Sequence, residues 1–192
     1  MEKKSAAMCF GRYNPPTFGH LLLWTKLSKP HPNIDGKFIY ASHSQDKKKN
    51  PLSYETKSAL IKYIIKNKGI DAEFVNSEAR TILEAMVDLY RKGYTKVIIV
   101  AGADRVDSLL FLVEDYNGKP LNKKGDFYNF EWIEGYNAGD RDPDADDITG
   151  MSASKVRQFA LDGKFEDFCE SIPIEDEMIA KSIYDEIRDI ML

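Results

Sequence analysis

The sequence lacks the features that mark secreted, membrane-bound and strongly nucleic-acid-binding proteins. Its 192 residues include two cysteines, Cys9 and Cys169, which form neither a disulfide framework nor the spacing of a metal site. No apolar run approaches the length that spans a bilayer, and no signal-type apolar segment follows the first four residues. The net charge of −4 gives no broad attraction to nucleic acid. We therefore expect a cytoplasmic protein with no membrane or nucleic-acid partner, in which any anion site is local.

Strand-like and helix-like patterns alternate along the chain. Short apolar runs predict strands at residues 5–10, 37–42, 71–75, 96–101 and 127–133. Amphipathic patterns predict helices at residues 54–66, 78–92, 106–113 and 175–192. This alternation predicts an α/β fold, namely a Rossmann-like, doubly wound parallel sheet with helices on both faces and a C-terminal helical segment. We expect residues 1–150 to form its core and residues 151–192 to be a C-terminal helical part of the same compact domain.

The loop after the first predicted strand has a composition suited to phosphate binding. Residues 11–20 read Gly-Arg-Tyr-Asn-Pro-Pro-Thr-Phe-Gly-His. Gly11 and Gly19 allow a ligand to approach the backbone closely, and the two prolines stiffen the loop. The apolar residues from Leu21 onward predict a helix, so His20 lies in its first turn, where free backbone N–H groups face any bound anion. On its own, a histidine at such a position is usually structural.

A second segment of this kind stands at residues 151–157, Met-Ser-Ala-Ser-Lys-Val-Arg. Ser152 is placed as a helix N-cap, and Val156 continues an apolar helical face. Hydroxyl groups and backbone N–H groups then gather at a helix N-terminus. Arg157 projects from the first turns, where a guanidinium binds phosphate oxygens in bidentate fashion. Taken alone, the segment is more typical of an ordinary capped helix with an exposed arginine.

Together the two segments resemble the paired signatures of the nucleotidyltransferase superfamily. Residues 17–20 match Thr/His-x-Gly-His at each fixed position, and residues 151–157 match Ile-Ser-x-Thr-x-x-Arg with Met for Ile and Ser for Thr. The preceding Asn-Pro-Pro at residues 14–16 has the form found in nucleotide adenylyltransferases. Residues 102–104, Gly-Ala-Asp, resemble a segment that follows the fourth strand in the same superfamily. Asp104 is also a candidate N-cap for the next helix, and both interpretations stay open.

The resemblance implies transfer of a nucleoside monophosphate from a nucleoside triphosphate, preferably ATP, to a phosphate-bearing acceptor, with release of pyrophosphate. It assigns His20 to the α-phosphate in the transition state, Arg157 to the β- and γ-phosphates, and Thr17 to the triphosphate. The other nucleotide- or phosphate-binding residues that it implies are Gly11, Arg12, Asn14, Gly19, Lys47, Gly102, Asp104, Ser152, Ser154 and Lys155. Mg²⁺ is expected to arrive with the triphosphate, without a metal site of the protein's own.

The acceptor follows less directly from the motifs. The chain looks most like nicotinamide or nicotinate mononucleotide adenylyltransferases, which would make a dinucleotide for NAD biosynthesis, although the loop at residues 116–130 has no clear counterpart in their pyridine-binding segment. The open alternatives are a cytidylyltransferase acting on a phospho-sugar or phospho-alcohol, a phosphopantetheine adenylyltransferase, and a nucleotide-binding regulator without turnover. The expected partners are a nucleoside triphosphate and a small phosphorylated acceptor. A homo-oligomer is left open.

Two charged loops leave a choice between function and plain surface. Lys47, Lys48 and Lys49 follow the second predicted strand and either close over a triphosphate, with help from Lys57, or are solvated. Residues 139–147 carry alternate aspartates but lack the glycine and glutamate of an EF-hand. They are therefore either a solvated loop or outer-shell ligands of magnesium.

Overall fold

The computed structural model describes residues 3–30, 33–139 and 151–192, so most of the aspartate-rich loop lies outside the described residues. The chain divides into two compact units, each built from three stretches of sequence. The sheet unit comprises Met1–Gly11, Leu23–Ser42 and Asp71–Asp140. The helical unit comprises Arg12–Leu22, His43–Ile70 and Arg141–Leu192. The single domain expected from the sequence stays a prediction.

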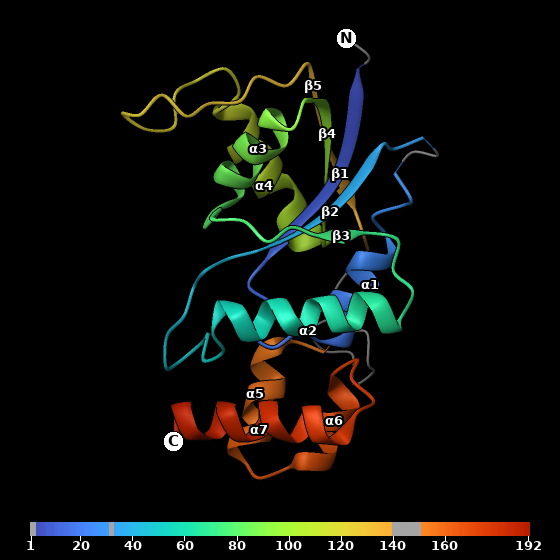
Figure 1. Cartoon of the computed structure of the whole chain (residues 1–192), viewed down its shortest axis with the longest axis vertical. Helices are drawn as coiled ribbons and strands as arrows, with labels where there is room; N and C mark the ends of the chain where they lie inside the picture. Colours follow the sequence, from blue (N-terminus) through green and yellow to red (C-terminus); the bar gives the residue numbers. More distant parts are fainter. Residues whose placement is uncertain (1–2, 31–32, 140–150) are drawn as a thin grey trace. The chain divides into compact units, whose positions relative to one another are not determined.

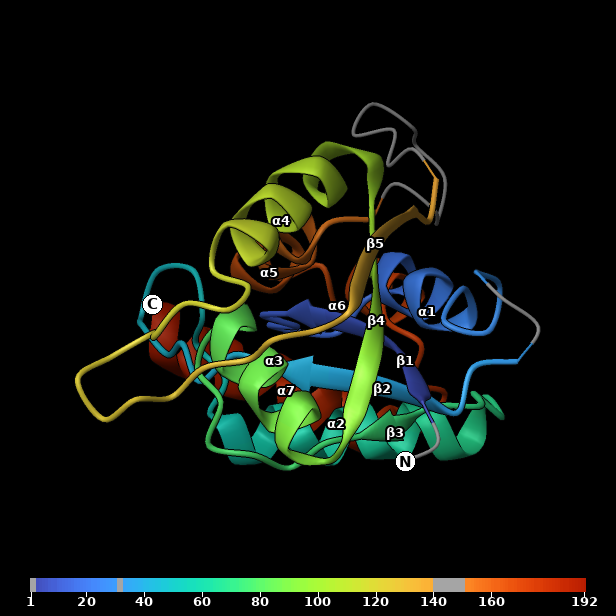
Figure 2. The same cartoon turned by 90° about the horizontal axis from the view of Figure 1, so that it is seen from above.

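The sheet unit contains five parallel strands, which Figures 1 and 2 show from two directions. They are β1 (Lys4–Gly11), β2 (Gly36–Ala41), β3 (Glu73–Phe74), β4 (Tyr94–Ala101) and β5 (Trp132–Asn137). Their order is β3-β2-β1-β4-β5, so the chain moves outward from β1 on one side and returns to build the other side. This is the strand order of a Rossmann-like, doubly wound sheet, and the fold class predicted from the alternation is confirmed.

Both faces of this sheet are buried. On one face, residues of β1, β2 and β4 pack against α3 (Ile82–Arg91) and neighbouring segments in a single apolar cluster. α4 (Ala103–Asp115) packs beside β5 and also contacts α3. The alternate strand residues, such as Cys9, Ile39 and Ile98, point to the opposite face and are buried as well. The buried strand residues that point to either face are apolar, with no polar residues between them. A parallel sheet of this kind is therefore buried on both faces.

Two boundaries in the sheet unit differ from those expected. β5 begins at Trp132 and not at residue 127, because Tyr128 and Phe130 are apolar core residues of a loop. The Tyr128 hydroxyl donates to the Val113 carbonyl at 2.7 Å, which ties this loop to α4. α4 begins at Ala103 with Gly102 as its N-cap, so the N-cap interpretation of Asp104 is wrong.

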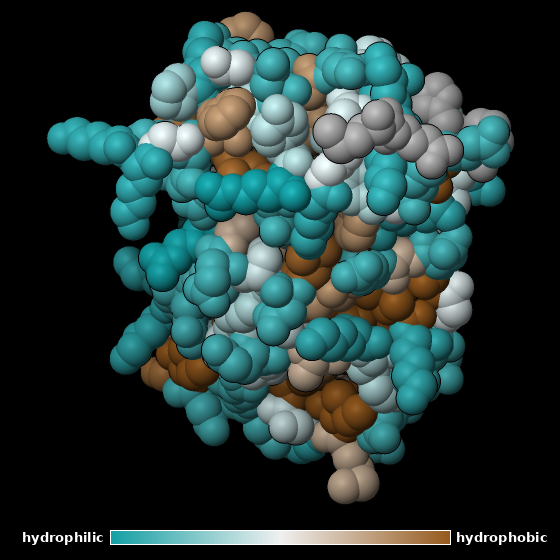
Figure 3. All heavy atoms as spheres, turned by 45° about the horizontal axis from the view of Figure 1, so that its top comes forward, coloured by the Kyte–Doolittle hydropathy of each residue, from teal (hydrophilic) through white to brown (hydrophobic). Residues whose placement is uncertain are grey.

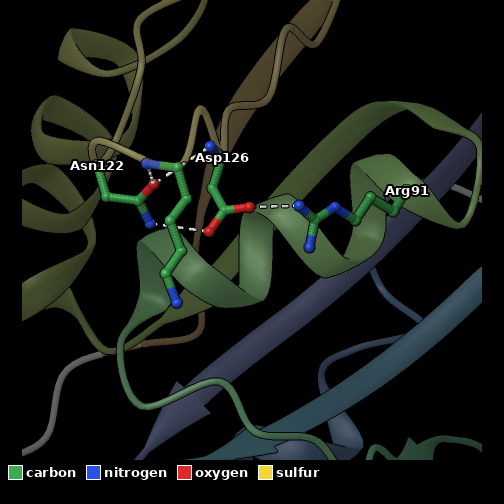
Figure 4. A network of polar contacts seen from close by, with 4 residues as sticks. Arg91, Asn122 and Asp126 are labelled. Carbon is green, nitrogen blue, oxygen red and sulfur yellow. Dashed lines mark hydrogen bonds and ion pairs between the residues drawn. The ribbon is translucent and has the colours of Figure 1, made fainter.

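The loop between α4 and β5 is held by polar contacts within itself and with α3. Asp126 accepts hydrogen bonds from Asn122 in the loop and from Arg91 in α3, as Figure 4 shows. Because β4 and β5 are parallel, α4 returns the chain to the edge at which the strands begin, and the loop lies there. Ligands of such sheets bind at the other edge, where the strands end. The loop therefore lies away from the ligand-binding edge of its own sheet.

The helical unit contains α2 (Tyr54–Asn67), α5 (Ala153–Leu161), α6 (Phe165–Ser171) and α7 (Glu177–Met191), together with the start of α1 (Phe18–Thr25). α5, α6 and α7 pack against one another, with the Tyr184 ring edge-on to Phe168. Thr56 of α2 donates to Glu186 of α7 at 3.3 Å.

No described helix is both long and apolar enough to cross a membrane. Figure 3 shows a mainly hydrophilic face with hydrophobic patches between the polar side chains.

Candidate functional site

The first motif, residues 14–20, leads directly into α1. The Thr17 carbonyl accepts the backbone N–H groups of His20 and Leu21, both at 3.0 Å, and so begins the helix. The Thr17 N–H donates to His20 Nδ1, also at 3.0 Å. Since Nδ1 accepts this bond, a neutral His20 carries its proton on Nε2. The motif therefore fixes the ring of His20 and leaves Nε2–H as the ring's donor.

The ring of Tyr13 also contacts the ring of His20. Its ring lies edge-on to that of His20, with 5.0 Å between the ring centroids and an interplanar angle of 86°. Its φ of 47° places a bulky, buried residue in the left-handed region, which such residues rarely adopt. Backbone strain of this kind often occurs at functional sites. Sequence reasoning missed Tyr13, since no sequence signal marks a left-handed tyrosine.

The second motif, residues 151–157, begins α5 as its sequence predicts. Ser152 is the N-cap, and its hydroxyl oxygen accepts the backbone N–H of Lys155 at 3.1 Å. A hydroxyl group both accepts and donates, so the Ser152 O–H remains able to donate to a ligand oxygen. The N-cap prediction for Ser152 is confirmed.

The two motifs, far apart in sequence, are joined by two hydrogen bonds inside the helical unit. The Thr17 hydroxyl donates to the Met151 carbonyl at 3.1 Å. Arg157 Nη1 donates to the Asn14 carbonyl at 2.7 Å. Each bond pairs a side chain of one motif with the backbone of the other. The tip of α5 and the turn before α1 are thus parts of one local structure.

Arg157 is buried, with 8 % of its surface exposed. Its Nη2 donates to the Ser154 hydroxyl at 3.1 Å. Burial lowers the pKa of its guanidinium, the nearby charge of Arg12 lowers it further, and Asp46 opposes the change. A buried guanidinium close to a second arginine favours an anion at this place, because an anion relieves both the burial and the repulsion.

We expect Thr17→Val to lower the free energy of unfolding by about 1–3 kcal/mol. The side chain of Thr17 is completely buried, and the valine removes the hydroxyl that donates to Met151 without changing the shape. Urea unfolding measures the effect, with Thr17→Ser as the control that keeps the hydroxyl. A valine variant as stable as the wild type would show that the bond from Thr17 to Met151 does not stabilise the fold.

The turn that carries Lys47, Lys48 and Lys49 (the lysine turn) is ordered by one carboxylate. Asp46 accepts hydrogen bonds from the backbone N–H groups of Lys48 and Lys49, at 2.9 and 2.7 Å, and from Asn50 Nδ2 at 2.6 Å. These bonds stabilise the ionised form and lower the pKa of Asp46 to about 2. The three lysines, Lys47 included, are exposed. The hydrogen bonds to Asp46 thus order a turn that carries exposed positive charge.

Lys57 lies in α2 and is fully buried. Its position in a lysine-rich region of the sequence does not predict this burial. Its ammonium donates to the Ser44 carbonyl at 3.4 Å. Burial lowers the pKa of Lys57 to about 8 from its ordinary value of 10.5. Between these values the unfolded chain binds the proton and the folded chain does not.

Stability should therefore rise with pH from about pH 8 to pH 10.5. We expect Lys57→Met to flatten this rise, since it removes the group that titrates. The measurement is urea unfolding of both proteins across the window, compared as a difference so that other titrating groups cancel. Parallel curves for the two proteins would show that Lys57 is not the cause.

The predicted site residues divide between the two units. The helical unit contains Arg12, Asn14, Thr17, Gly19, His20, Lys47, Ser152, Ser154, Lys155 and Arg157. The sheet unit contains Gly11, Gly102 and Asp104. Gly11 ends β1 and Gly102 follows β4, and these two strands are neighbours, so both glycines lie at the edge where the strands end. A Cβ on Gly102 would lie 3.0 Å from the Asp104 carboxylate, so this glycine leaves room for an acidic side chain.

Solved structures with the same fold bind nucleotides. Plasmodium falciparum nicotinic acid mononucleotide adenylyltransferase, in complexes with APC and with NaAD, has a TM-score of 0.58 and 17 % identity, over 95 % of this chain and 98 % of that chain. Thermotoga maritima TmcAL, bound with alpha-thio ATP, has a TM-score of 0.53 and 13 % identity, over 95 % of this chain and 56 % of that chain. The chain has the nucleotidyltransferase fold. No family model and no curated protein matches the sequence. The resemblance inferred from the two motifs is thus confirmed at the level of the fold.

Proposed function

We propose that this nucleotidyltransferase fold is catalytic, and that the chain transfers a nucleoside monophosphate, with ATP as the favoured donor, to a phosphate-bearing acceptor. The observation that carries the proposal is the pair of hydrogen bonds that joins the two motifs, Thr17 to Met151 and Arg157 to Asn14. They bring a fixed imidazole and a buried guanidinium into one local structure. The nucleotide complexes of the similar structures support the choice of ATP.

In the proposed reaction, an oxygen of the acceptor phosphate attacks the α-phosphorus. The bond from that phosphorus to the bridging oxygen breaks, and pyrophosphate leaves with the electron pair. His20 Nε2 donates to the α-phosphate as negative charge accumulates there. Arg157 holds the β- and γ-phosphates. Because the chemistry needs charge stabilisation more than proton transfer, preorganised donors supply most of the effect.

The remaining predicted residues have supporting roles in this proposal. Thr17 spends its hydroxyl on the Met151 carbonyl, so we assign it the positioning of His20 and α5, which differs from the direct triphosphate contact expected from the sequence. The donors that we assign to the triphosphate are the Gly11 and Arg12 backbone, the α1 N-terminus at Gly19, Lys47, Ser152, Ser154 and Lys155. Gly102 and Asp104 stay predictions for the nucleotide and acceptor.

Magnesium enters this proposal with the triphosphate. Among the described residues, no group of three or more His, Cys, Asp or Glu side chains is arranged to hold a metal ion. The side chains of the helical unit that we assign to the triphosphate include cations, which bind phosphate oxygens and not a metal ion. In this proposal, Mg²⁺ is therefore held by the triphosphate itself. When bound, Mg²⁺ neutralises part of the charge on the phosphates.

Nicotinate or nicotinamide mononucleotide is the acceptor that we favour. Its support is the likeness to the Plasmodium falciparum adenylyltransferase, which was solved with NaAD. The experiment is a screen for pyrophosphate release with ATP, CTP, GTP and UTP, each paired with mononucleotide, phospho-sugar and phosphopantetheine acceptors. We expect release with ATP and a pyridine mononucleotide. No release with any pair would favour a nucleotide-binding regulator.

A further inference from the structure

Asn14 bonds to two other segments of the helical unit at once. Its Nδ2 donates to the Leu52 carbonyl and its Oδ1 accepts the Leu52 N–H, both at 3.0 Å. Its own backbone carbonyl accepts the bond from Arg157 Nη1. Asn14 is 1 % exposed, so its amide lies inside the protein. The direct phosphate contact expected from the sequence stays a prediction, and the structure shows the amide bonded within the protein.

The two bonds to Leu52 restrict the peptide that holds Arg157. A side-chain amide paired in this way cannot turn without breaking a buried hydrogen bond. The direction of the Asn14 carbonyl is therefore limited by the side chain of the same residue, which is anchored to Leu52. Since Arg157 donates to that carbonyl, the direction of the guanidinium is set with it.

We infer that Asn14 is a positioning residue that aims Arg157 at the triphosphate, with the Leu52 backbone as its anchor. The inference rests on the proposed function, since it presumes that Arg157 binds the β- and γ-phosphates. Leu52 lies directly before Ser53, the N-cap of α2, and shortly after the lysine turn. The anchor thus connects both motifs to the segment that precedes α2.

The chain offers a matched control for this contact. Asn117 Nδ2 donates to the Phe130 carbonyl at 3.0 Å, and its Oδ1 accepts the Phe130 N–H at 2.9 Å. This is the same two-bond arrangement, but it lies in the sheet unit and its residues belong to neither motif. A loss of stability alone would follow from either asparagine, whereas a change in phosphate recognition should follow only from Asn14.

The experiment compares the affinities for ATP and AMP by calorimetry in the wild type and in Asn14→Ala, Asn117→Ala, Arg157→Ala and the double variant of Asn14 and Arg157. We expect Asn14→Ala to weaken ATP binding about tenfold, because it misaligns a charged donor, and to leave AMP nearly unchanged. Asn117→Ala should change neither affinity. The double variant should bind ATP no worse than Arg157→Ala, because both changes remove the same contact.

Asn14→Asp serves if the alanine variant does not fold, since it keeps the acceptor for the Leu52 N–H and should give an intermediate loss. A preference for ATP over AMP that depends on Arg157 but survives both Asn14 changes would overturn the inference alone. Losses that multiply in the double variant would do the same. A wild type without any preference for ATP would overturn the proposed function as well.

Discussion

Replacement of His20 by alanine should lower kcat by about 10²- to 10³-fold, as expected for the loss of one preorganised donor to a developing charge. The Thr17 N–H and the Tyr13 ring contact the imidazole, so under the proposed function its Nε2–H would meet the α-phosphate without reorganisation. Steady-state kinetics with saturating ATP and acceptor measures the loss. The KM for ATP should change much less, because the contact strengthens in the transition state.

Three further variants separate this role from a structural one. His20→Asn keeps an acceptor for the Thr17 N–H but lacks the distal donor, so it should fold well and be as slow as the alanine variant. His20→Gln carries a donor near the position of Nε2 and should recover part of kcat. His43 belongs to the same unit and stacks on Tyr54 at 3.8 Å, so His43→Ala is the control that should keep kcat. Unchanged turnover in His20→Asn would remove His20 from the mechanism.

Replacement of Arg157 by alanine should weaken ATP binding by roughly 10²-fold, because a buried charged donor is lost, and AMP binding by far less. Its guanidinium is buried beside the positive charge of Arg12, a setting that an anion of several charges stabilises more than a monophosphate does. Calorimetry with both nucleotides gives the comparison. Arg157→Lys keeps the charge but not the planar fork, so it should recover only part of the affinity.

The control for Arg157 must distinguish binding from folding. Arg80 is exposed in the sheet unit, and Arg80→Ala should leave both affinities unchanged. Urea unfolding of Arg157→Ala shows how much stability the bond to the Asn14 carbonyl contributes. Equal losses for ATP and AMP in a folded Arg157→Ala would contradict the assignment to the β- and γ-phosphates.

The sequence predicts strands and helix ends well where the local residue pattern alone determines them. β1, β2 and β4 lie at the expected apolar runs, and Ser152 caps α5 as its residue type indicates. The pattern fails at residues 127–131. Tyr128 and Phe130 are buried because they belong to the apolar core, and not because they belong to a strand. Periodicity does not distinguish these two causes of burial.

The candidate site was predictable only in its residue types. The motifs indicate that His20 and Arg157 belong together, but the contacts that hold them depend on tertiary structure. Nothing in the local sequence indicates that Arg157 is buried against the Asn14 carbonyl, or that Tyr13 adopts a left-handed backbone. The burial of Lys57 is hidden in the same way, since a lysine among lysines predicts solvent exposure.

The central claim is that the two motifs form one polyphosphate site, and a crystal structure with an ATP analogue that carries a methylene group between the α- and β-phosphates tests it most directly. We predict that the α-phosphate lies within hydrogen-bond distance of His20 Nε2 and that the β- or γ-phosphate contacts the Arg157 guanidinium. A polyphosphate bound elsewhere, with neither side chain in contact, would contradict the account.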